Sequence, residues 1–439
     1  MSVPGDFISA KRKLKGGVMN NTFDTLESEV RSYIRLFPAI FEKSEDACMY
    51  DVKGNRYIDF FAGAGVLNYG HNNPKVSNAL IRYIQNNGII HSLDMATSAK
   101  KEFLEKFSAV ILKPRNLNYK IQFTGPTGTN AVEAAVKLSR IVKKRSGIIA
   151  FTNSFHGLTA GSLSLTAKMF YRSGTFVNRS EVAFMPYDNY FGQGTDTAEM
   201  IRTMLTDPGS GVEIPAAIIL ETLQAEGGIN IAGKAWLQKI RQICTDFDIL
   251  MIVDDIQVGN GRTGRFFSFE DSEIVPDMVL LSKSLGGGLP MSVVLIKPEY
   301  DMWEPGKHTG TFRGNNLAFV AATELLSYCE NNSLSAEIMK KGRILKDTLQ
   351  DFLCKYAELS PEVRGKGLIW GLKLQRNGFC REVSRRAFQK GLIIETAGAH
   401  LDVLKFMPPL TIDESLLSEG LEIINESVDY VMRKEKTVS

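Results

Sequence analysis

Short apolar runs alternate with segments of helical spacing through the middle of the chain. Residues 216–220 and 250–253 are continuous apolar runs, and residues 236–247 between them place apolar side chains on one face of a helix. Further buried strands are predicted at residues 148–151, 182–184 and 278–281. Strand, helix and strand in succession are typical of βαβ units, so the pattern predicts an α/β fold whose large domain has a mainly parallel sheet between helices.

The pattern changes after about residue 317, where longer helical segments dominate. Residues 318–328 and 335–356 predict helices, and residues 371–374 and 392–394 predict short strands. This mixture indicates a second, smaller α+β domain.

Near the start of the chain, residues 49–61 alternate around the turn Lys53-Gly54-Asn55, which predicts a β-hairpin. A single hydrophobic core stops growing at roughly 250–300 residues, so a chain of 439 residues is expected to form more than one domain. We expect residues 1–68 to join the small domain, residues 69–320 to form the large domain, and residues 321–439 to complete the small one.

Composition excludes several classes of protein. Hydrophobic residues make up 44% and charged residues 23%, as in ordinary globular proteins. The net charge of +3 is spread along the chain apart from the run Lys11-Arg12-Lys13, so no nucleic-acid surface is indicated. No apolar stretch is long enough for a membrane span or a signal segment, and five separated cysteines without a CxxC pair favour neither disulfides nor zinc. We expect a cytoplasmic protein without bound metal.

A lysine at the end of one predicted strand is the first candidate for chemistry. Lys283 follows the strand at residues 278–281 and precedes three glycines at residues 286–288. A lysine amine can form an imine with an aldehyde when burial lowers its pKa, and glycines allow a ligand to approach the backbone closely. The same pattern also fits an exposed lysine before a turn.

A carboxylate ends a second predicted strand. Asp254 follows the apolar residues 250–253, and a buried carboxylate is costly unless it is paired. A protonated ring nitrogen of a cofactor is one possible partner. The alternatives are a helix cap or an ion pair with Arg262 or Arg265.

Three loops add candidates for binding a flat, phosphorylated ligand. Gly128 and Thr129 lie where a loop enters a helix, and a helix N-terminus suits a phosphate, although capped loops also occur without ligands. Phe155 follows the strand at residues 148–151 and could stack on a ring or pack in the core. Thr311 lies in a polar, glycine-containing loop before a helix and could donate to a phosphate.

In their order along the chain, their spacing and their residues, these segments resemble those of the class III, or ω-, aminotransferases of fold type I, which use pyridoxal 5′-phosphate (PLP). The resemblance runs from about Glu27 to Val431. It implies that Lys283 holds PLP as a Schiff base and that Asp254 pairs with the ring nitrogen. The cofactor site implied by the resemblance comprises Gly128, Thr129, Phe155, His156, Asp254, Gln257, Lys283 and Thr311.

The remaining roles follow from the same resemblance. Gln257 would contact the phenolic oxygen of the ring, and Phe155 would stack on the ring. Gly128 and Thr129 would hold the phosphate. Thr311 would reach the phosphate in the neighbouring subunit, which implies a homodimer with active sites at the subunit interface.

Within class III, the sequence is most similar to the diaminobutyrate:2-oxoglutarate aminotransferases. The segments that carry this similarity are residues 93–97, 122–133, 150–153 and 392–396. These enzymes interconvert L-2,4-diaminobutyrate and 2-oxoglutarate with L-aspartate 4-semialdehyde and L-glutamate, so the expected partners are a small amino donor and a keto acid. The chain departs from the wider class at Asn130, where a glutamate is usual.

A second departure concerns the substrate carboxylate. Lys405 stands where the wider class has an arginine, which in many members pairs with a glutamate matching Glu226 and is released to bind the carboxylate of glutamate. A lysine offers a point charge without the bidentate fork of arginine. We expect Lys405 and Glu226 to form the switchable pair in this chain.

Three other interpretations remain. Gly63-Ala64-Gly65 suggests a dinucleotide-binding oxidoreductase, but Asn68 stands where the third glycine of that fingerprint belongs. A catalytically silent scaffold with this fold is a second, against which the intact Lys283 and Asp254 speak. The third is an ω-aminotransferase for 4-aminobutyrate, ornithine or a specialised diamine, because a fold does not determine a substrate.

Overall fold

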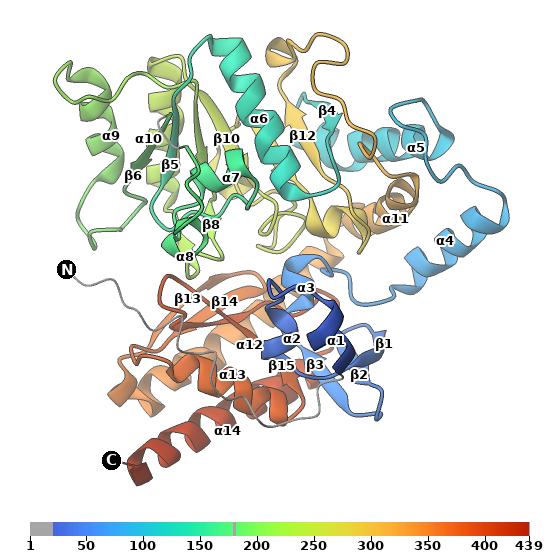
Figure 1. The fold of residues 1–439 in the computed structure, drawn as a ribbon, viewed down its shortest axis with the longest axis vertical. Coiled ribbons are helices and arrows are strands. Elements are labelled where there is room, and N and C mark those ends of the chain that lie inside the picture. Colours follow the sequence, from blue (N-terminus) through green and yellow to red (C-terminus); the bar gives the residue numbers. More distant parts are fainter. Residues whose placement is uncertain (1–20, 179–180, 439) are drawn as a thin grey trace.

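The computed structural model describes residues 21–178 and 181–438, which form a large and a smaller lobe (Figure 1). The basic run Lys11-Arg12-Lys13 lies outside the described residues. Within the described residues, no helix is long and apolar enough to cross a membrane. The proposed domain ranges 1–68, 69–320 and 321–439 stay a prediction.

The large lobe is built on a seven-stranded sheet. In spatial order its strands are β4 (Lys120–Phe123), β12 (Val293–Ile296), β11 (Met278–Leu281), β10 (Leu250–Asp254), β7 (Ala217–Leu220), β5 (Ile148–Phe151) and β6 (Val182–Met185). Strand β12 is antiparallel to both of its neighbours, whereas the pairs from β11 to β6 are parallel. The predicted, mainly parallel sheet is confirmed.

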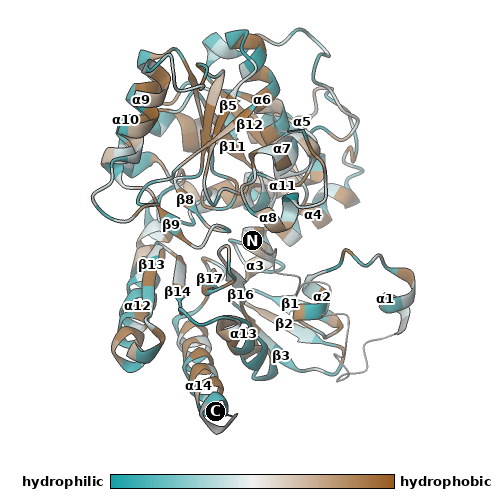
Figure 2. Ribbon diagram, turned by 60° about the vertical axis from the view of Figure 1, so that its left-hand side comes forward, coloured by the Kyte–Doolittle hydropathy of each residue, from teal (hydrophilic) through white to brown (hydrophobic). Residues whose placement is uncertain are grey.

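Alternate residues of each strand pack on opposite faces of this sheet. On β11, Val279 and Leu281 belong to one hydrophobic cluster, and Met278 and Leu280 belong to the other. Both faces are covered by helices, so the strands need apolar residues at every position, which explains their continuous apolar runs. Figure 2 shows these strands as hydrophobic ribbons inside helices whose outer surfaces are more hydrophilic.

The helices of the large lobe divide between the two faces. Helix α6 packs on one face through Ala131, Val132 and Ala135, while the other face contacts α5, α10 and α11. The helices of this lobe are α4 (Pro74–Gln85), α5 (Ser98–Phe107), α6 (Gly128–Lys143), α7 (Ala160–Leu165), α8 (Met169–Arg172), α9 (Thr197–Thr206), α10 (Lys234–Asp246) and α11 (Asn316–Leu326).

Short elements complete the large lobe. A two-stranded ribbon is formed by β8 (Leu223–Gln224) and β9 (Asn230–Ile231). A π-helical turn at Ser108–Leu112 continues α5. Single 3₁₀ turns occur at Lys113–Arg115, Glu270–Ser272, Lys283–Gly286, Pro298–Tyr300 and Ser327–Cys329.

The smaller lobe contains two four-stranded sheets. The first has the order β1 (Phe41–Glu45), β2 (Cys48–Asp51), β3 (Arg56–Asp59) and β15 (Leu392–Ile393). The second has the order β13 (Glu362–Lys366), β14 (Ile369–Lys373), β17 (Val403–Phe406) and β16 (Glu395–Ala397). The predicted hairpin is the antiparallel pair β2 and β3, and β15 pairs with β3, so early and late parts of the chain share one sheet.

The last three helices along the chain pack on the core of the smaller lobe, and three shorter ones belong to its early part. They are α1 (Asn21–Leu26), α2 (Tyr33–Leu36), α3 (Ala62–Gly65), α12 (Ser333–Lys355), α13 (Phe379–Gln389) and α14 (Glu414–Val438), with a 3₁₀ turn at Ala357–Leu359. The glycines Gly63 and Gly65 belong to α3 and follow β3, a strand of an antiparallel hairpin. They do not follow the first strand of a parallel sheet, as a dinucleotide fingerprint requires.

Candidate active site

Polar residues gather at the carboxyl ends of the central parallel strands. Asp254 ends β10 and lies beside Leu280 of β11, so Lys283 follows at the same edge of the sheet. The side chain of Gln257 donates from Nε2 to the carbonyl of Ala64 in the smaller lobe (2.9 Å). This edge therefore faces the smaller lobe, in the crevice where open α/β sheets bind ligands.

Lys283 has the features of a reactive amine. Its backbone lies in the left-handed region, at φ +48°, which costs a non-glycine residue about 1 kcal/mol. Its side chain makes no ion pair with any residue that the structure describes. Burial lowers the pKa of the ammonium group, against an opposing effect of Glu226. A lowered pKa favours the neutral, nucleophilic form of the amine.

Asp254 is a buried carboxylate without a lysine or arginine partner. Its side chain is 6% exposed, Oδ2 lies 2.7 Å from Nδ1 of His156, and Oδ1 accepts from the N–H of Ile256 (3.2 Å). In the part of the chain that the structure describes, His156 is the single side chain that could form an ion pair with it. A buried carboxylate in this setting is stabilised by any further cation or N–H donor that enters the site.

The two arginines considered as partners of Asp254 bind elsewhere. Arg262 is fully buried, and it donates to the carbonyls of Leu368 and Pro408 and to Oδ1 of Asn68. Arg265 pairs with Asp271 at 3.2 Å. The interpretation of Asp254 as a partner of either arginine is therefore wrong.

The start of α6 contains the predicted phosphate-binding residues. Thr127 and Asn130 form a capping box that starts the helix at Gly128. The first N–H groups of a helix have no partner within it, so those of Gly128 and Thr129 are suited to an anion. The hydroxyl of Thr129 lies within hydrogen-bond distance of Thr159 (2.7 Å) and Ser162 (2.5 Å).

Phe155 is half-buried beside this loop. Its N–H donates to Oε1 of Glu221 (3.0 Å), and its ring packs edge-on against Tyr171, with 5.6 Å between centroids. Glu221 follows β7, and burial raises its pKa well above the usual range. Glu221 is not among the site residues predicted from the sequence, although it also lies at the end of a continuous apolar strand, as Asp254 does.

Lys405 and Glu226 are in contact, as we expected. The ammonium of Lys405 is fully buried and lies 2.6 Å from Glu226 Oε1 and 2.7 Å from Glu395 Oε1. Burial alone would lower the pKa of Lys405, but the two carboxylates outweigh it and raise the pKa. Gln257 also donates to Glu226 (3.1 Å), and Lys405 lowers the pKa of Glu226 to about 2 against the effect of burial.

Glu395 is a third member of this cluster that sequence analysis missed. It lies opposite Lys405 where β16 pairs with β17, and burial raises its pKa to about 7. A glutamate directly after a short apolar run, at residues 392–394, was the available signal. One lysine here compensates two carboxylates.

Thr311 lies outside this cluster within a single chain. It is exposed, and its carbonyl lies 2.9 Å from Nε2 of His91. Its expected role in a neighbouring subunit stays a prediction.

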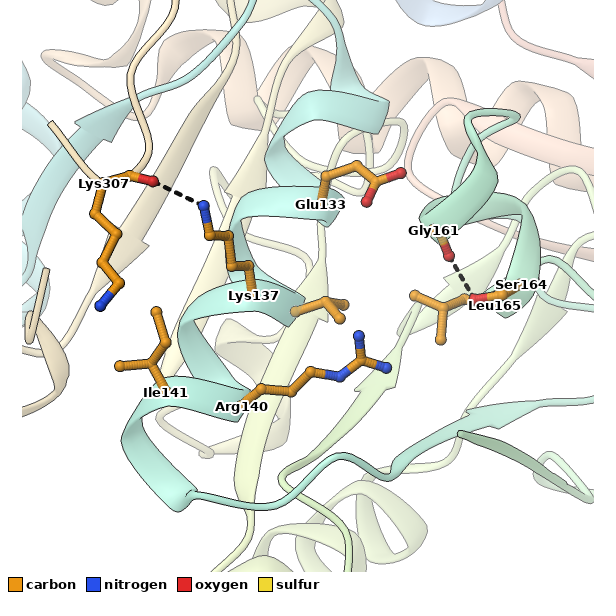
Figure 3. A pocket seen from close by; sticks show the side chains of 9 residues that line it. Glu133, Lys137, Arg140, Ile141, Gly161, Ser164, Leu165 and Lys307 are labelled. Carbon is orange, nitrogen blue, oxygen red and sulfur yellow. Dashed lines mark hydrogen bonds between the residues drawn. The ribbon is translucent and has the colours of Figure 1, made fainter. Parts of the chain in front are cut away.

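A surface pocket of about 400 Å³ lies apart from these residues. It follows the outer side of α6, where Lys137 donates to the carbonyl of Lys307 (2.7 Å), and it extends to Gly161 and Leu165 of α7 (Figure 3). None of the predicted site residues lines it. The pocket is therefore separate from the predicted site residues.

Lys283, Asp254 and the start of α6 fit PLP. A lysine without an ion pair and a carboxylate without a basic partner other than His156 lie at one sheet edge. An aldehyde and a protonated ring nitrogen would engage both groups. The start of α6 supplies donors for a phosphate.

Comparisons with known proteins agree with this chemistry. The family model for class III aminotransferases matches residues 31–428. A diaminobutyrate–2-oxoglutarate transaminase of Wolinella succinogenes is 59% identical over 94% of this chain and 97% of its own length. One of the same name from Halalkalibacterium halodurans is 53% identical over 95% and 98% of the two chains.

The fold is also similar to solved structures. An ornithine aminotransferase from Toxoplasma gondii superposes with a TM-score of 0.83 at 24% identity, covering 99% of this chain and 100% of that one. This likeness supports the α/β fold with its mainly parallel sheet. From the family match and the identities to its relatives, the chain belongs to the class III aminotransferases, a family of PLP-dependent transaminases.

Proposed function

We propose that this enzyme transfers the 4-amino group of L-2,4-diaminobutyrate to 2-oxoglutarate, giving L-aspartate 4-semialdehyde and L-glutamate, and that it also catalyses the reverse reaction. The observation that supports this proposal most directly is the 59% identity to a diaminobutyrate–2-oxoglutarate transaminase over nearly the whole chain. The cluster around Lys283 and Asp254 provides the groups that amino transfer needs.

Particular residues are proposed to hold PLP. Lys283 would bind its aldehyde carbon, and Asp254 would accept a hydrogen bond from its ring nitrogen. His156 would orient Asp254 through the 2.7 Å contact, and Gly128 and Thr129 would donate to the phosphate. Phe155 would cover one face of the ring, and Gln257 would contact the phenolic oxygen.

When bound, PLP supplies an aldehyde that accepts the amino group and a ring that withdraws electrons from the reacting carbon. The amine of Lys283 would remove a proton from C4 of diaminobutyrate. Burial lowers the pKa of this amine, which keeps a larger fraction in the basic form. Asp254 holds a proton at the ring nitrogen. Since the two substrates use one site in turn, the kinetics should follow a ping-pong pattern.

The neighbouring subunit is proposed to complete the site. Thr311 is exposed in the single chain, although its loop belongs to the predicted cofactor set. In a homodimer its hydroxyl would reach the phosphate of the other subunit. The active sites would then lie at the interface.

The second substrate has a carboxylate that requires a cation. We propose that Lys405 supplies it when Glu226 swings away, because Glu226 is the more exposed of its two partners, with 26% of its side chain accessible against 6% for Glu395. Glu395 would then keep Lys405 charged in both states.

Replacing Lys405 with alanine should raise the KM for L-glutamate by roughly 10- to 100-fold, because a charged hydrogen bond is worth about 1.5–3 kcal/mol. It should also lower thermal stability, since two buried carboxylates lose their cation. Lys405→Arg, which keeps the charge, should retain most of the affinity. An unchanged glutamate half-reaction in a folded Lys405→Ala enzyme would rule out this role.

The substrate is tested by mixing the PLP-loaded enzyme with L-2,4-diaminobutyrate in the absence of a keto acid. The visible absorbance of lysine-bound PLP should decay within the first turnover and return after 2-oxoglutarate is added. Ornithine and 4-aminobutyrate serve as comparison amines and should react more slowly. If one of them bleaches the band and diaminobutyrate does not, the enzyme remains an aminotransferase and the proposed substrate is wrong.

A further inference from the structure

Lys168 lies directly before α8, a short helix on the side of the large lobe that faces the smaller one (Figure 1). Its ammonium donates to the carbonyl of Gly398 (3.1 Å), just beyond β16, and lies 5.8 Å from the centroid of the Tyr171 ring. The side chain is partly buried. One residue thus joins the two lobes beside the polar cluster.

Two contacts connect Lys168 to the proposed cofactor and substrate residues. The ring of Tyr171 packs against Phe155, with 5.6 Å between centroids. The N–H of Gly398 donates to the carbonyl of Glu226 (3.0 Å). Lys168 is therefore connected through Tyr171 to the ring proposed to cover PLP, and through Gly398 to the Glu226–Lys405 pair.

Glu226 is the carboxylate with the largest effect on the charge of Lys168, but the two side chains do not form an ion pair. Among the described residues Lys168 forms no ion pair, whereas Lys405 is held by two carboxylates. Burial is the main cause that lowers the pKa of Lys168, and Glu226 opposes this effect. An ammonium group has three donors, and the carbonyl of Gly398 uses one of them. Two donors and a full charge are left for a ligand.

An amino-acid substrate needs such a group. The carboxylate of L-2,4-diaminobutyrate keeps its charge throughout amino transfer, and a buried charge must be paired. Lys283 is occupied by the reaction, and Lys405 is already compensated. We propose that Lys168 binds the carboxylate of the diamino-acid substrate and so selects amino acids over simple diamines. This inference rests on the proposed function.

Two truncated substrates separate this role from a structural one. 4-Aminobutyrate is diaminobutyrate without its 2-amino group, and 1,3-diaminopropane is diaminobutyrate without its carboxylate. With Lys168→Gln, the half-reaction rate constant at low substrate should fall on the order of 30-fold for diaminobutyrate and 4-aminobutyrate, the loss of one charged hydrogen bond. The rate with 1,3-diaminopropane should stay within about twofold of wild type.

A ligand that cannot react gives a second measurement. Butyrate has the carboxylate and no amine, so its inhibition constant should rise with Lys168→Gln by a similar factor. Arg381→Gln is the matched control, because Arg381 is an exposed cation of α13 whose charge helps to lower the pKa of Lys168. This control should leave all three amines and butyrate unchanged.

The outcomes are distinct. Equal losses for all three amines, with butyrate inhibition unchanged, would overturn the carboxylate role and leave Lys168 as a structural contact between the lobes. A selective loss in Arg381→Gln instead would transfer the role to Arg381 and also overturn the proposal. If the wild-type enzyme does not react with diaminobutyrate, the proposed substrate fails, but the comparison of 4-aminobutyrate with 1,3-diaminopropane still tests Lys168.

Discussion

Replacing Lys283 with alanine should lower turnover by at least about 10⁴-fold and remove the visible absorbance of lysine-bound PLP together with the activity. Both effects have the same cause, because one amine is proposed to bind the aldehyde and to move the proton at the reacting carbon. Burial lowers the pKa of this amine, and no described residue forms an ion pair with it. Steady-state assays and an absorbance spectrum of the same preparation test both parts.

Lys283→Arg is the sharper companion variant. Arginine keeps the positive charge but stays protonated at any accessible pH, so it should neither bind the aldehyde nor act as a base. It should therefore be as inactive as the alanine variant while remaining folded. Lys355→Ala, in the smaller lobe, removes a lysine that bonds to Asn425 and Asp429 and should leave turnover within about twofold. Substantial activity in both Lys283 variants would contradict the assignment.

The central sheet and its catalytic edge could be predicted because they depend on local patterns. Buried parallel strands need apolar residues on both faces, so runs such as residues 278–281 stand out in the sequence. A polar residue directly after such a run falls at the carboxyl edge of the sheet. Asp254 and Lys283 were found in this way, although only the parallel register of β10 and β11 makes them neighbours.

The rest of the site depends on contacts between segments far apart in the chain. Glu395 meets Lys405 through the pairing of two short strands, and no local pattern specifies that register. Lys168 lies near Glu226 because a loop of the large lobe contacts the end of β16. Lys168 follows no such apolar run, and Glu395 follows the short run at residues 392–394, which does not belong to the large sheet.

Arg262 shows a different limit of the sequence. A charged residue a few positions after a carboxylate suggested an ion pair, yet the structure buries Arg262 completely, and its two terminal nitrogens donate to two carbonyls and an amide oxygen. Burial lowers its pKa to about 9, whereas Asp59 raises it. The guanidinium of Arg262 thus connects three segments, through Asn68, Leu368 and Pro408. It forms no ion pair with Asp254.

Replacing Asp254 with asparagine should lower the rate constant of the amine half-reaction by roughly 10³-fold, the cost of removing one aligned charge from a buried reaction site. Asparagine has the same shape and can still accept a hydrogen bond from the N–H of Ile256. It cannot hold a proton at the ring nitrogen by its charge. The measurement is rapid mixing of the PLP-loaded variant with diaminobutyrate, since a full-turnover assay could be limited by another step.

Asp255 offers a matched control because it is the next residue, is also buried, and accepts a hydrogen bond from the N–H of Ser268 (3.1 Å). Burial raises its pKa to about 7, so its side chain is partly neutral before any substitution. Asp255→Asn should therefore change the half-reaction by less than about tenfold, although stability can fall. If the two variants lost activity equally, the effect of Asp254→Asn would reflect the packing of this strand end, and the carboxylate could no longer be assigned to the ring nitrogen.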